Sequence, residues 1–274
     1  MNYAKYSVLM SVYYKEQPDW LKISIDSMLN QTVRADEFII IKDGFLTAEL
    51  NSVLYEYTDK YPKLFKIIGL EKNVGLGPAL AIGILNSKNE LIARMDSDDY
   101  SIPKRCELQL KVLESNPKLA AVGSYEIEFE NSLDNIISIH CVPETSKDIF
   151  DFMKRRCALL HPTVMYKKSA VLSCGNYHDM RLYEDYDLFT RLVMENKEEC
   201  YNIQKGLYYI RTSDQFFKRR GGWSYMKTML SFKKRQYKNG YMSLKDFIVS
   251  AGGQAVVCLL PNNVRKWFYL KFLR

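Results

Sequence analysis

The sequence predicts an α/β fold in which a mostly parallel central sheet is flanked by helices and followed by a helical C-terminal extension. In the first hundred residues, short apolar runs of strand length alternate with segments whose apolar residues recur at helical spacing. The runs are apolar at consecutive positions, which is typical of parallel strands buried on both faces. The chain has 274 residues, 47% of them hydrophobic, so it can bury a full core, and collagen, coiled-coil and disordered classes are excluded.

The first hundred residues are expected to contain strands and helices in strict alternation. The predicted strands lie at 7–12, 38–41, 65–70 and 91–95. Pro18 and Asp19 open the first helix, because a proline in the first turn costs no hydrogen bond. Asp43-Gly44 ends the second strand, and later helices cover about 47–60 and 77–85.

The pattern after residue 100 is less regular. Pro103 is expected to open a helix that runs through Leu113 and ends at Asn116-Pro117. Further elements are expected as extended runs at 120–128, 136–139, 163–166 and 206–211, and as a helix at 183–195. The C-terminal segment has helical spacing, with turns at 239–240 and 261–262.

No feature of the sequence indicates secretion, a structural zinc site or a membrane span. The six cysteines lie far apart and form no CxxC or Cys/His cluster. The N-terminus enters an apolar strand directly and does not resemble a signal peptide. The longest apolar stretch, 247–260, has 14 residues with polar and glycine interruptions, whereas a spanning helix needs about 18 to 20. We therefore expect a cytoplasmic protein.

Positive charge is concentrated near the C-terminus. Residues 215–274 contain 13 Lys or Arg and one acid, a net charge of +12, whereas the first 214 residues carry −5. Aromatic residues such as Trp223 and Trp267 are interspersed among these cations. The combination suits either nucleic acid or an anionic membrane surface, and composition alone does not choose between them.

Polar residues follow each of the first four predicted strands. They are Ser11-Val12-Tyr13, Asp43-Gly44, Asn73-Val74-Gly75 and Arg94-Met95-Asp96-Ser97-Asp98-Asp99. Open parallel sheets bind ligands at the carboxyl ends of their strands, so we expect these residues to line one crevice. Neither a GxGxxG nor a P-loop motif follows the first strand, which argues against a dinucleotide-binding or triphosphate-binding loop there.

Asp96, Asp98 and Asp99 place three carboxylates within four residues. Like charges at this spacing repel one another, and a divalent cation with oxygen ligands is the usual remedy. A metal held in this way keeps open positions for substrate phosphates. The alternative is a solvated acidic turn that caps the helix beginning near Pro103.

Several motifs occur in an order that carries a family resemblance. They are Lys42-Asp43-Gly44, Asn73-Val74-Gly75-Leu76-Gly77, the acidic segment at 92–99, His161-Pro162-Thr163, Glu184-Asp185-Tyr186 and Arg219-Arg220-Gly221-Gly222. Together they resemble the family 2 glycosyltransferases, which have the Rossmann-like GT-A fold, and within them the bacterial amylovoran, O-antigen and capsule enzymes. The resemblance runs from about Tyr6 to Arg274. It implies an enzyme that transfers a sugar from a nucleotide donor.

The resemblance implies a donor site at the strand ends. Its residues would be Ser11, Val12, Tyr13, Asp43, Asn73, Gly75, Arg94, Asp96 and Ser97. The first three would bracket the nucleobase, and Asp43 would accept a hydrogen bond from uracil or ribose. Many family members carry Asp-Asp-Gly-Ser at the second strand end, whereas this chain has Lys42-Asp43-Gly44-Phe45.

The resemblance also implies a divalent cation, Mn²⁺ or Mg²⁺, bound near the donor diphosphate. Asp98 would bind it, with Asp96 as a second ligand or as a contact to ribose or a metal-bound water. His161 is a further candidate ligand, or a contact to the diphosphate. A lone histidine is alternatively a hydrogen-bonded structural residue.

The base and the acceptor site are expected in the later motifs. By resemblance, Asp185 is the general base of a single displacement that inverts the anomeric centre. Arg219 and Arg220 would clamp a donor or acceptor diphosphate, because guanidinium pairs bidentately with phosphate oxygens, and Glu184 and His161 would lie beside them. Alternatively, Glu184 and Asp185 are acids that complement the dipole of the helix that they begin. For Arg219 and Arg220 the alternative is a basic surface loop.

The sequence is therefore interpreted as a metal-dependent, inverting glycosyltransferase. It would have a GT-A catalytic domain at 1–214, with a nucleotide-binding half at 1–100 and an acceptor half at 101–214, and a basic aromatic helical extension at 215–274. The donor would be a UDP-sugar, with galactose or glucose as the hexose, and the acceptor a polyprenyl-diphosphate-linked sugar in O-antigen, capsule or exopolysaccharide synthesis. The extension would rest on the cytoplasmic face of the inner membrane, and a homodimer is compatible with the sequence.

Two other classes remain open at this point. A nucleotidyltransferase of sugar phosphates would share the sheet and the acids, but it would need a Gly-rich basic loop after the first strand, where Tyr13-Tyr14-Lys15-Glu16 stands. A nucleic-acid-binding protein would explain the basic C-terminal segment. It would leave the acidic motifs without a role, so no nucleic-acid partner is expected.

Overall fold

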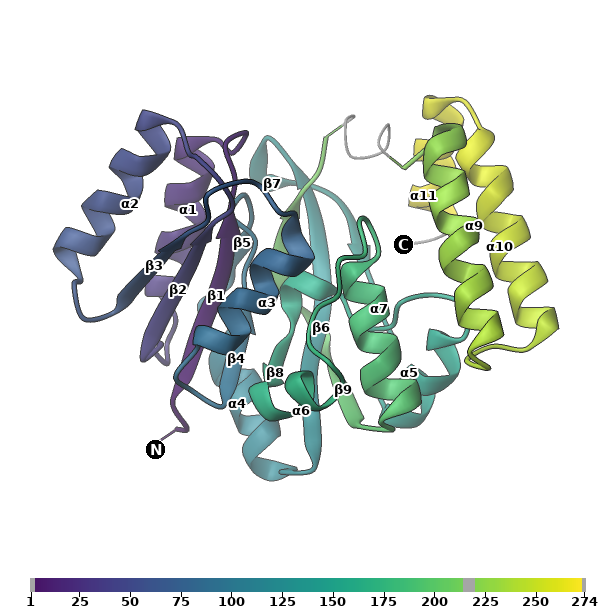
Figure 1. Ribbon diagram of the computed structural model, residues 1–274, viewed down its shortest axis with the longest axis horizontal. Coiled ribbons are helices and arrows are strands. Elements are labelled where there is room, and N and C mark those ends of the chain that lie inside the picture. The colour runs from purple at the N-terminus through teal and green to yellow at the C-terminus, as the bar shows by residue number, and fades with distance from the viewer. Residues whose placement is uncertain (1–2, 214–219, 273–274) are drawn as a thin grey trace.

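A computed structural model describes residues 3–213 and 220–272. The strands are β1 (Tyr6–Val12), β2 (Glu37–Lys42), β3 (Phe65–Gly69), β4 (Leu91–Arg94), β5 (Tyr100–Ser101), β6 (Leu119–Glu130), β7 (Ser132–His140), β8 (Met165–Lys167) and β9 (Glu199–Arg211). The helices are α1 (Pro18–Leu29), α2 (Ala48–Lys60), α3 (Leu76–Asn86), α4 (Arg105–Ser115), α5 (Ser146–Met153), α6 (Lys168–Ser173), α7 (Glu184–Thr190), α9 (Gly222–Lys238), α10 (Leu244–Leu259) and α11 (Asn262–Phe272). The described strands form one sheet, shown with its helices in Figure 1.

The N-terminal half of the sheet is parallel, as predicted. Its order is β3-β2-β1-β4, and each strand runs parallel to its neighbours. Successive side chains of a strand point to opposite faces, so Val8 and Met10 of β1 pack in the core formed with α1, α2 and α4, whereas Leu9 packs in the core formed with α3. Helices on both faces explain why the strands are apolar at consecutive positions (Figure 1).

The rest of the sheet is mixed. β8 lies antiparallel between β4 and β6, β6 pairs parallel with β9, and β7 and β5 lie antiparallel to β6 and β9. The α/β class with flanking helices is confirmed, and the parallel arrangement that the sequence predicts holds for β1 to β4. The long strand β9 returns to the edge where β1, β2 and β4 end.

Most of the predicted elements agree with the structure, and the differences lie after residue 100. The helix expected at 183–195 is α7 followed by a π-helix, Arg191–Glu195, which ends where the N–H of Asn196 donates to the carbonyl of Arg191 over 2.9 Å. β9 has 13 residues, longer than expected, because polar residues at its exposed positions hide the strand pattern. α5 and α6 were not predicted.

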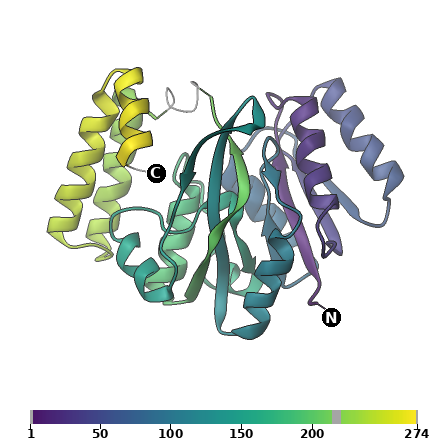
Figure 2. The same cartoon turned by 180° about the vertical axis from the view of Figure 1, so that it is seen from behind.

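The predicted helical extension consists of α9, α10 and α11. These helices pack together at the end of the sheet remote from α2 (Figures 1 and 2). The expected turn at 239–240 is present, with Gly240 at a φ of +77°. None of the helices in the described ranges is long and apolar enough to cross a membrane.

Gly44 fixes the turn after β2, where the chain approaches the loop that follows β3. Its φ is +87°, and a Cβ at this position would lie 2.7 Å from the backbone nitrogen of Asn73. Gly240 also has a positive φ, but a Cβ there would meet no atom within 4 Å. A substitution at Gly240 therefore meets only the strain of a positive φ, whereas a substitution at Gly44 meets this strain and a steric clash with the neighbouring backbone.

We expect Gly44→Ala to destabilise the protein more than Gly240→Ala. Positive φ costs an alanine about 1–2 kcal/mol at either position, and displacement of the neighbouring backbone adds about 1–3 kcal/mol at Gly44 only. Urea unfolding of the two variants and the wild type measures both losses. Equal losses would show that the turn after β2 does not depend on the close approach.

Candidate active site

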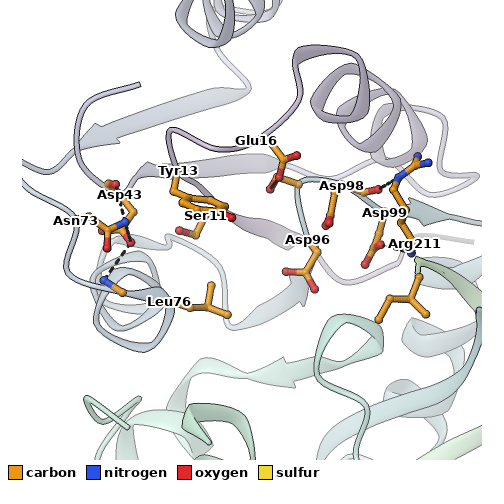
Figure 3. A pocket seen from close by; sticks show the side chains of 13 residues that line it. Ser11, Tyr13, Glu16, Asp43, Asn73, Leu76, Asp96, Asp98, Asp99 and Arg211 are labelled. Carbon is orange, nitrogen blue, oxygen red and sulfur yellow. Dashed lines mark hydrogen bonds between the residues drawn. The ribbon is translucent and has the colours of Figure 1, made fainter. Parts of the chain in front are cut away.

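A cavity of about 400 Å³ lies at the carboxyl ends of β1, β2 and β4 (Figure 3). We call it the donor cavity. Its lining residues are Ser11, Tyr13, Glu16, Asp43, Asn73, Gly75, Leu76, Asp96, Ser97, Asp98, Asp99, Ile210 and Arg211. Most of the residues expected at the strand ends therefore meet in one crevice, as the sequence predicts.

Asp43 organises the loop after β3. Its carboxylate accepts hydrogen bonds from the side-chain amide of Asn73 over 2.9 Å and from the backbone N–H groups of Val74 over 2.7 Å and Gly75 over 3.1 Å. Gly75 has a φ of +92°, which directs its N–H toward this carboxylate and opens α3. Asp43 thus shapes one wall of the donor cavity, and its predicted contact with uracil or ribose stays a prediction.

The acidic segment after β4 points into the opposite side of the cavity. Figure 3 shows the carboxylates of Asp96, Asp98 and Asp99 beside one another. Asp99 is buried and accepts from the backbone N–H of Arg211 over 2.7 Å. Burial raises the pKa of Asp99 well above its usual value, and the negative charges of Asp98 and Asp96 raise it further. A positive charge in the cavity would relieve this repulsion.

The donor set of Asp96 and Asp98 fits a divalent cation that shares its coordination sphere with a substrate. Mg²⁺ and Mn²⁺ bind through one or two carboxylates plus phosphate oxygens and water. No cluster of three or more His, Cys, Asp or Glu residues suited to a metal occurs within 3–213 and 220–272. The predicted third ligand, His161, lines another cavity.

Arg94 and Val12 do not reach the donor cavity, which corrects two of the predicted donor contacts. The guanidinium of Arg94 is fully buried and forms an ion pair with Asp96 over 2.5 Å. Val12 is also fully buried, and its carbonyl accepts from the N–H of Asp43 over 2.8 Å. Side chains of a strand point alternately to its two faces, and this alternation turns both residues away from the cavity. Arg94 positions Asp96 by their ion pair, and Val12 packs in the core.

The sequence analysis missed Ile210 and two polar residues of the donor cavity, Glu16 and Arg211. Glu16 accepts a hydrogen bond from the hydroxyl of Ser97, and burial raises its pKa. Arg211 places its guanidinium 4.5 Å from the ring centre of Trp20 and donates to the backbone carbonyl of Asp98 over 2.9 Å. Arg211 ends β9, so the strand-end argument would have found it had it been applied to this strand.

A second cavity, of about 520 Å³, lies between the sheet and the C-terminal helices. We call it the acceptor cavity. Its lining residues include Glu126, His140, Arg155, Arg156, Cys157, Leu159, His161, Tyr183, Asp185, Tyr186, Ile210, Arg220, Tyr225, Lys233, Val249, Gly253, Val257, Phe268 and Tyr269. Ile210 lines both cavities, so the two adjoin at the end of β9.

Asp185 lies in the first turn of α7 and faces the acceptor cavity. Its carboxylate accepts from the N–H of Tyr186 over 2.7 Å. Burial raises the pKa of Asp185, whereas the positive charge of Arg220 opposes the rise. A carboxylate with a raised pKa is a stronger base than one in water. Asp185 is therefore suited to remove a proton from a bound hydroxyl.

The neighbours of Asp185 have structural contacts. Asp187 is buried, forms an ion pair with Arg191 over 2.9 Å, and lies 3.0 Å from Nδ1 of His178. Glu184 lines neither cavity, because α7 turns it toward Gly77 at the start of α3, and its contact with the acceptor stays a prediction. Burial and the charge of Asp185 raise the pKa of Glu184 to about 7.

His161 is buried in the wall of the acceptor cavity. Its Nε2 lies 2.8 Å from the hydroxyl of Tyr177, and its ring packs edge-on against Tyr177 and Phe189. Burial and the nearby charge of Arg94 lower its pKa well below the usual value, so the ring is neutral. The structural alternative for His161 is supported. Of the predicted arginine pair, Arg220 lines this cavity and Arg219 lies outside the described residues.

We expect Glu184→Gln to stabilise the protein at high pH. The folded state raises the pKa of Glu184 from 4.5 to about 7, so its ionisation costs stability as the pH rises through this interval. With a pKa of about 7 in the folded state, the substitution should raise the free energy of unfolding by at most about 3 kcal/mol at pH 8 and by little at pH 5. Urea unfolding at both pH values measures it, with Glu71→Gln at an exposed position as the control. A gain that is the same at both values would contradict the charge argument.

Comparisons with known proteins agree with this geometry. The family model "Glycosyl transferase family 2" matches residues 7–177. The UDP-Gal:alpha-D-GlcNAc-diphosphoundecaprenol beta-1,3-galactosyltransferase of Escherichia coli is 36% identical over 270 residues, covering 98% of this chain and 97% of the relative. The amylovoran biosynthesis glycosyltransferase AmsE of Erwinia amylovora is 33% identical, covering 97% of this chain and 98% of the relative.

Solved structures share the fold. The mannosyltransferase PcManGT of Pyrobaculum calidifontis, in complex with GDP-Man and Mn²⁺, superposes with a TM-score of 0.64 at 12% identity, covering 96% of this chain and 72% of that one. Residues 1–349 of S. aureus TarS superpose with a TM-score of 0.60 at 16% identity, covering 97% and 87%. Because the family model spans most of the sheet, and relatives match nearly the whole chain, the protein belongs to glycosyl transferase family 2.

Proposed function

We propose that this glycosyltransferase moves a hexose, galactose or glucose, from a UDP-sugar to a polyprenyl-diphosphate-linked sugar with inversion at the anomeric carbon. The reaction would serve O-antigen, capsule or exopolysaccharide synthesis. The observation that carries the proposal is the meeting of two cavities at Ile210, one lined by carboxylates at strand ends and the other by Asp185. A donor and an acceptor bound in adjoining cavities can exchange a sugar without release.

The choice of donor and acceptor is supported by the Escherichia coli relative, whose name gives UDP-Gal and a diphosphoundecaprenol-linked sugar. That relative matches this chain from end to end, including the C-terminal helices. The donor cavity fits a nucleotide because Tyr13, which is 42% exposed, lines it together with the acids and offers a ring face. Aromatic faces stack well on bases.

Asp96 and Asp98 would hold the divalent cation. When bound, Mn²⁺ or Mg²⁺ offsets the negative charge that develops on the departing diphosphate. Arg94 fixes the carboxylate of Asp96 by an ion pair, and Tyr208 accepts from the N–H of Asp96 over 3.1 Å, so this part of the cavity is held in place before substrate binds.

Asp185 would act as the general base. In a single displacement its carboxylate takes the proton of the acceptor hydroxyl while the hydroxyl oxygen bonds to the anomeric carbon of the donor. The bond from that carbon to the diphosphate oxygen breaks with the electron pair, and attack from the opposite face inverts the configuration. Residues 1–100 would then supply most of the donor cavity, and residues 101–214 together with the extension would supply the acceptor cavity.

The C-terminal helices would contact the inner-membrane surface on its cytoplasmic face, where a polyprenyl acceptor resides. α10 exposes Ile248 at 60% and Val256 at 63%, and α11 exposes Trp267 at 53%. Lysines are interspersed with these side chains, as in helices that lie in an anionic membrane interface. A basic nucleic-acid site remains the less favoured reading, because it gives Asp185 and its cavity no role.

We expect Asp98→Ala and Asp185→Asn to fail at different steps. Asp98→Ala removes a ligand of the cation, so binding of UDP-galactose or UDP-glucose in the presence of Mn²⁺ should weaken at least tenfold in a titration calorimeter. Asp185→Asn should bind the donor as the wild type does and lose transfer by about 10²- to 10⁴-fold. Asp134→Ala, on an exposed hairpin, is the control. Equal loss of donor binding in both variants would refute the division of roles.

The surface of α10 and α11 should bind anionic membranes. In sedimentation with phosphatidylglycerol vesicles, Ile248→Ser and Trp267→Ser should each reduce the bound fraction, because both remove exposed apolar area from the contact. Tyr55→Ser, on α2 at the far end of the molecule, is the control, since Tyr55 is 70% exposed. Binding that depends equally on Tyr55 would place the contact elsewhere.

A further inference from the structure

We propose that the acceptor cavity binds the lipid end of the acceptor as well as its sugar, with the diphosphate beside Lys233 and the first isoprenoid units leaving between α10 and α11 past Gly253. The inference rests on the proposed function and assigns the parts of one substrate to parts of one cavity. Its basis is that a base, several cations and a group of apolar side chains line the same cavity.

Lys233 is the first part of the argument. It is 1% exposed, and its ammonium donates to the carbonyl of Arg155 over 2.5 Å and lies 4.9 Å from the ring centre of Tyr186. Its hydrogen-bond partners within the described residues, the carbonyl of Arg155 and the hydroxyl of Tyr186, are uncharged. Burial lowers its pKa to about 8, so most of it is still charged at neutral pH. A buried cation of this kind is stabilised by an anion that enters the cavity.

Further cations line the same cavity. Arg155, Arg156 and Arg220 are on its wall together with Lys233. Asp185 and Lys233 both contact Tyr186, since the carboxylate of Asp185 accepts from its backbone N–H and the ammonium of Lys233 lies 4.9 Å from its ring centre. The base and the cations therefore lie in one neighbourhood. A sugar whose hydroxyl reaches Asp185 would place its own diphosphate near Lys233.

The side of the acceptor cavity formed by α10 and α11 is apolar and reaches the surface. Val257 is buried and lies within α10, whereas Val249 is 52% exposed and still lines the cavity. Phe268 and Tyr269 of α11 face the same space. A sugar nucleotide or a free oligosaccharide has no hydrocarbon chain to cover these side chains, whereas an isoprenoid diphosphate carries both an anion and an apolar chain.

The acceptor cavity reaches the exposed surface of α10, where Val249 and Gly253 line it. Val249 and Gly253 belong to the same helix as Ile248, Val256 and Leu259, which are at least half exposed. An isoprenoid chain that leaves the cavity at Gly253 therefore continues over side chains that suit a membrane interface. Charge complementarity and the apolar exit together favour a lipid diphosphate as the occupant.

Gly252 and Gly253 offer a matched pair of variants. A Cβ at either position would meet no atom within 4 Å, and neither glycine requires a positive φ. Both are exposed in α10, but only Gly253 lines the cavity. Leucine at either position should be accepted by the helix, so Gly253→Leu narrows the exit while Gly252→Leu leaves it open.

The test is titration calorimetry with geranylgeranyl diphosphate, geranylgeraniol and inorganic diphosphate, in EDTA so that a metal in the donor cavity plays no part. We expect Gly253→Leu to weaken the binding of geranylgeranyl diphosphate at least tenfold and to leave the affinity for inorganic diphosphate unchanged. Gly252→Leu should bind both ligands as the wild type does. Lys233→Met should weaken the binding of both diphosphates, and the melting temperature of this variant shows whether it is folded. Equal affinity in the two glycine variants, or an alcohol that binds as tightly as the diphosphate, would overturn the inference.

A transfer assay separates this inference from the proposed function. If the wild type uses a lipid-diphosphate sugar and both glycine variants have the same KM for it, the lipid site is wrong and the proposed function stands. If the isoprenoid diphosphate binds as expected but no UDP-sugar is transferred to any lipid-diphosphate sugar, the lipid site stands and the proposed function fails.

Discussion

The buried guanidinium of Arg94 acts on both cavities, and the arrangement of the site depends on it. A fully buried cation is tolerated only when its charge is offset by close partners, and here Asp96 supplies that charge at 2.5 Å. In the wall of the acceptor cavity, burial lowers the pKa of His161, and the charge of the same guanidinium lowers it further. The end of β4 therefore fixes the donor-side acids and keeps a histidine of the acceptor side neutral.

The negative charges of the site are arranged in two groups with different surroundings. The donor-side acids lie close together: burial raises the pKa of Asp99, the charges of Asp98 and Asp96 raise it further, and a cation would relieve the repulsion. Asp185 lies across the boundary at Ile210, where burial raises its pKa while cations line the wall. One fold thus maintains an acid cluster suited to a metal and a single carboxylate suited to accept a proton.

The strand-end argument predicted much of the donor cavity from the sequence, because the carboxyl ends of parallel strands must meet at one edge. It succeeded for Ser11, Asp43, Asn73 and the acids, and it failed for Arg94 because sequence does not show which face an end residue takes. The acceptor cavity could not be predicted in this way. Its walls come from β6, α7, β9 and the C-terminal helices, and only tertiary packing brings them together.

The family match ends at residue 177, whereas the acceptor cavity includes Lys233, Gly253 and Phe268. Most of the donor cavity lies inside the matched region, and the helices that close the acceptor cavity lie beyond it. Under the proposed function, the part that matches the family model therefore carries most of the donor cavity, and the helices beyond it meet the acceptor. Such a division lets related enzymes recognise new acceptors through substitutions in the C-terminal helices while the donor cavity is retained.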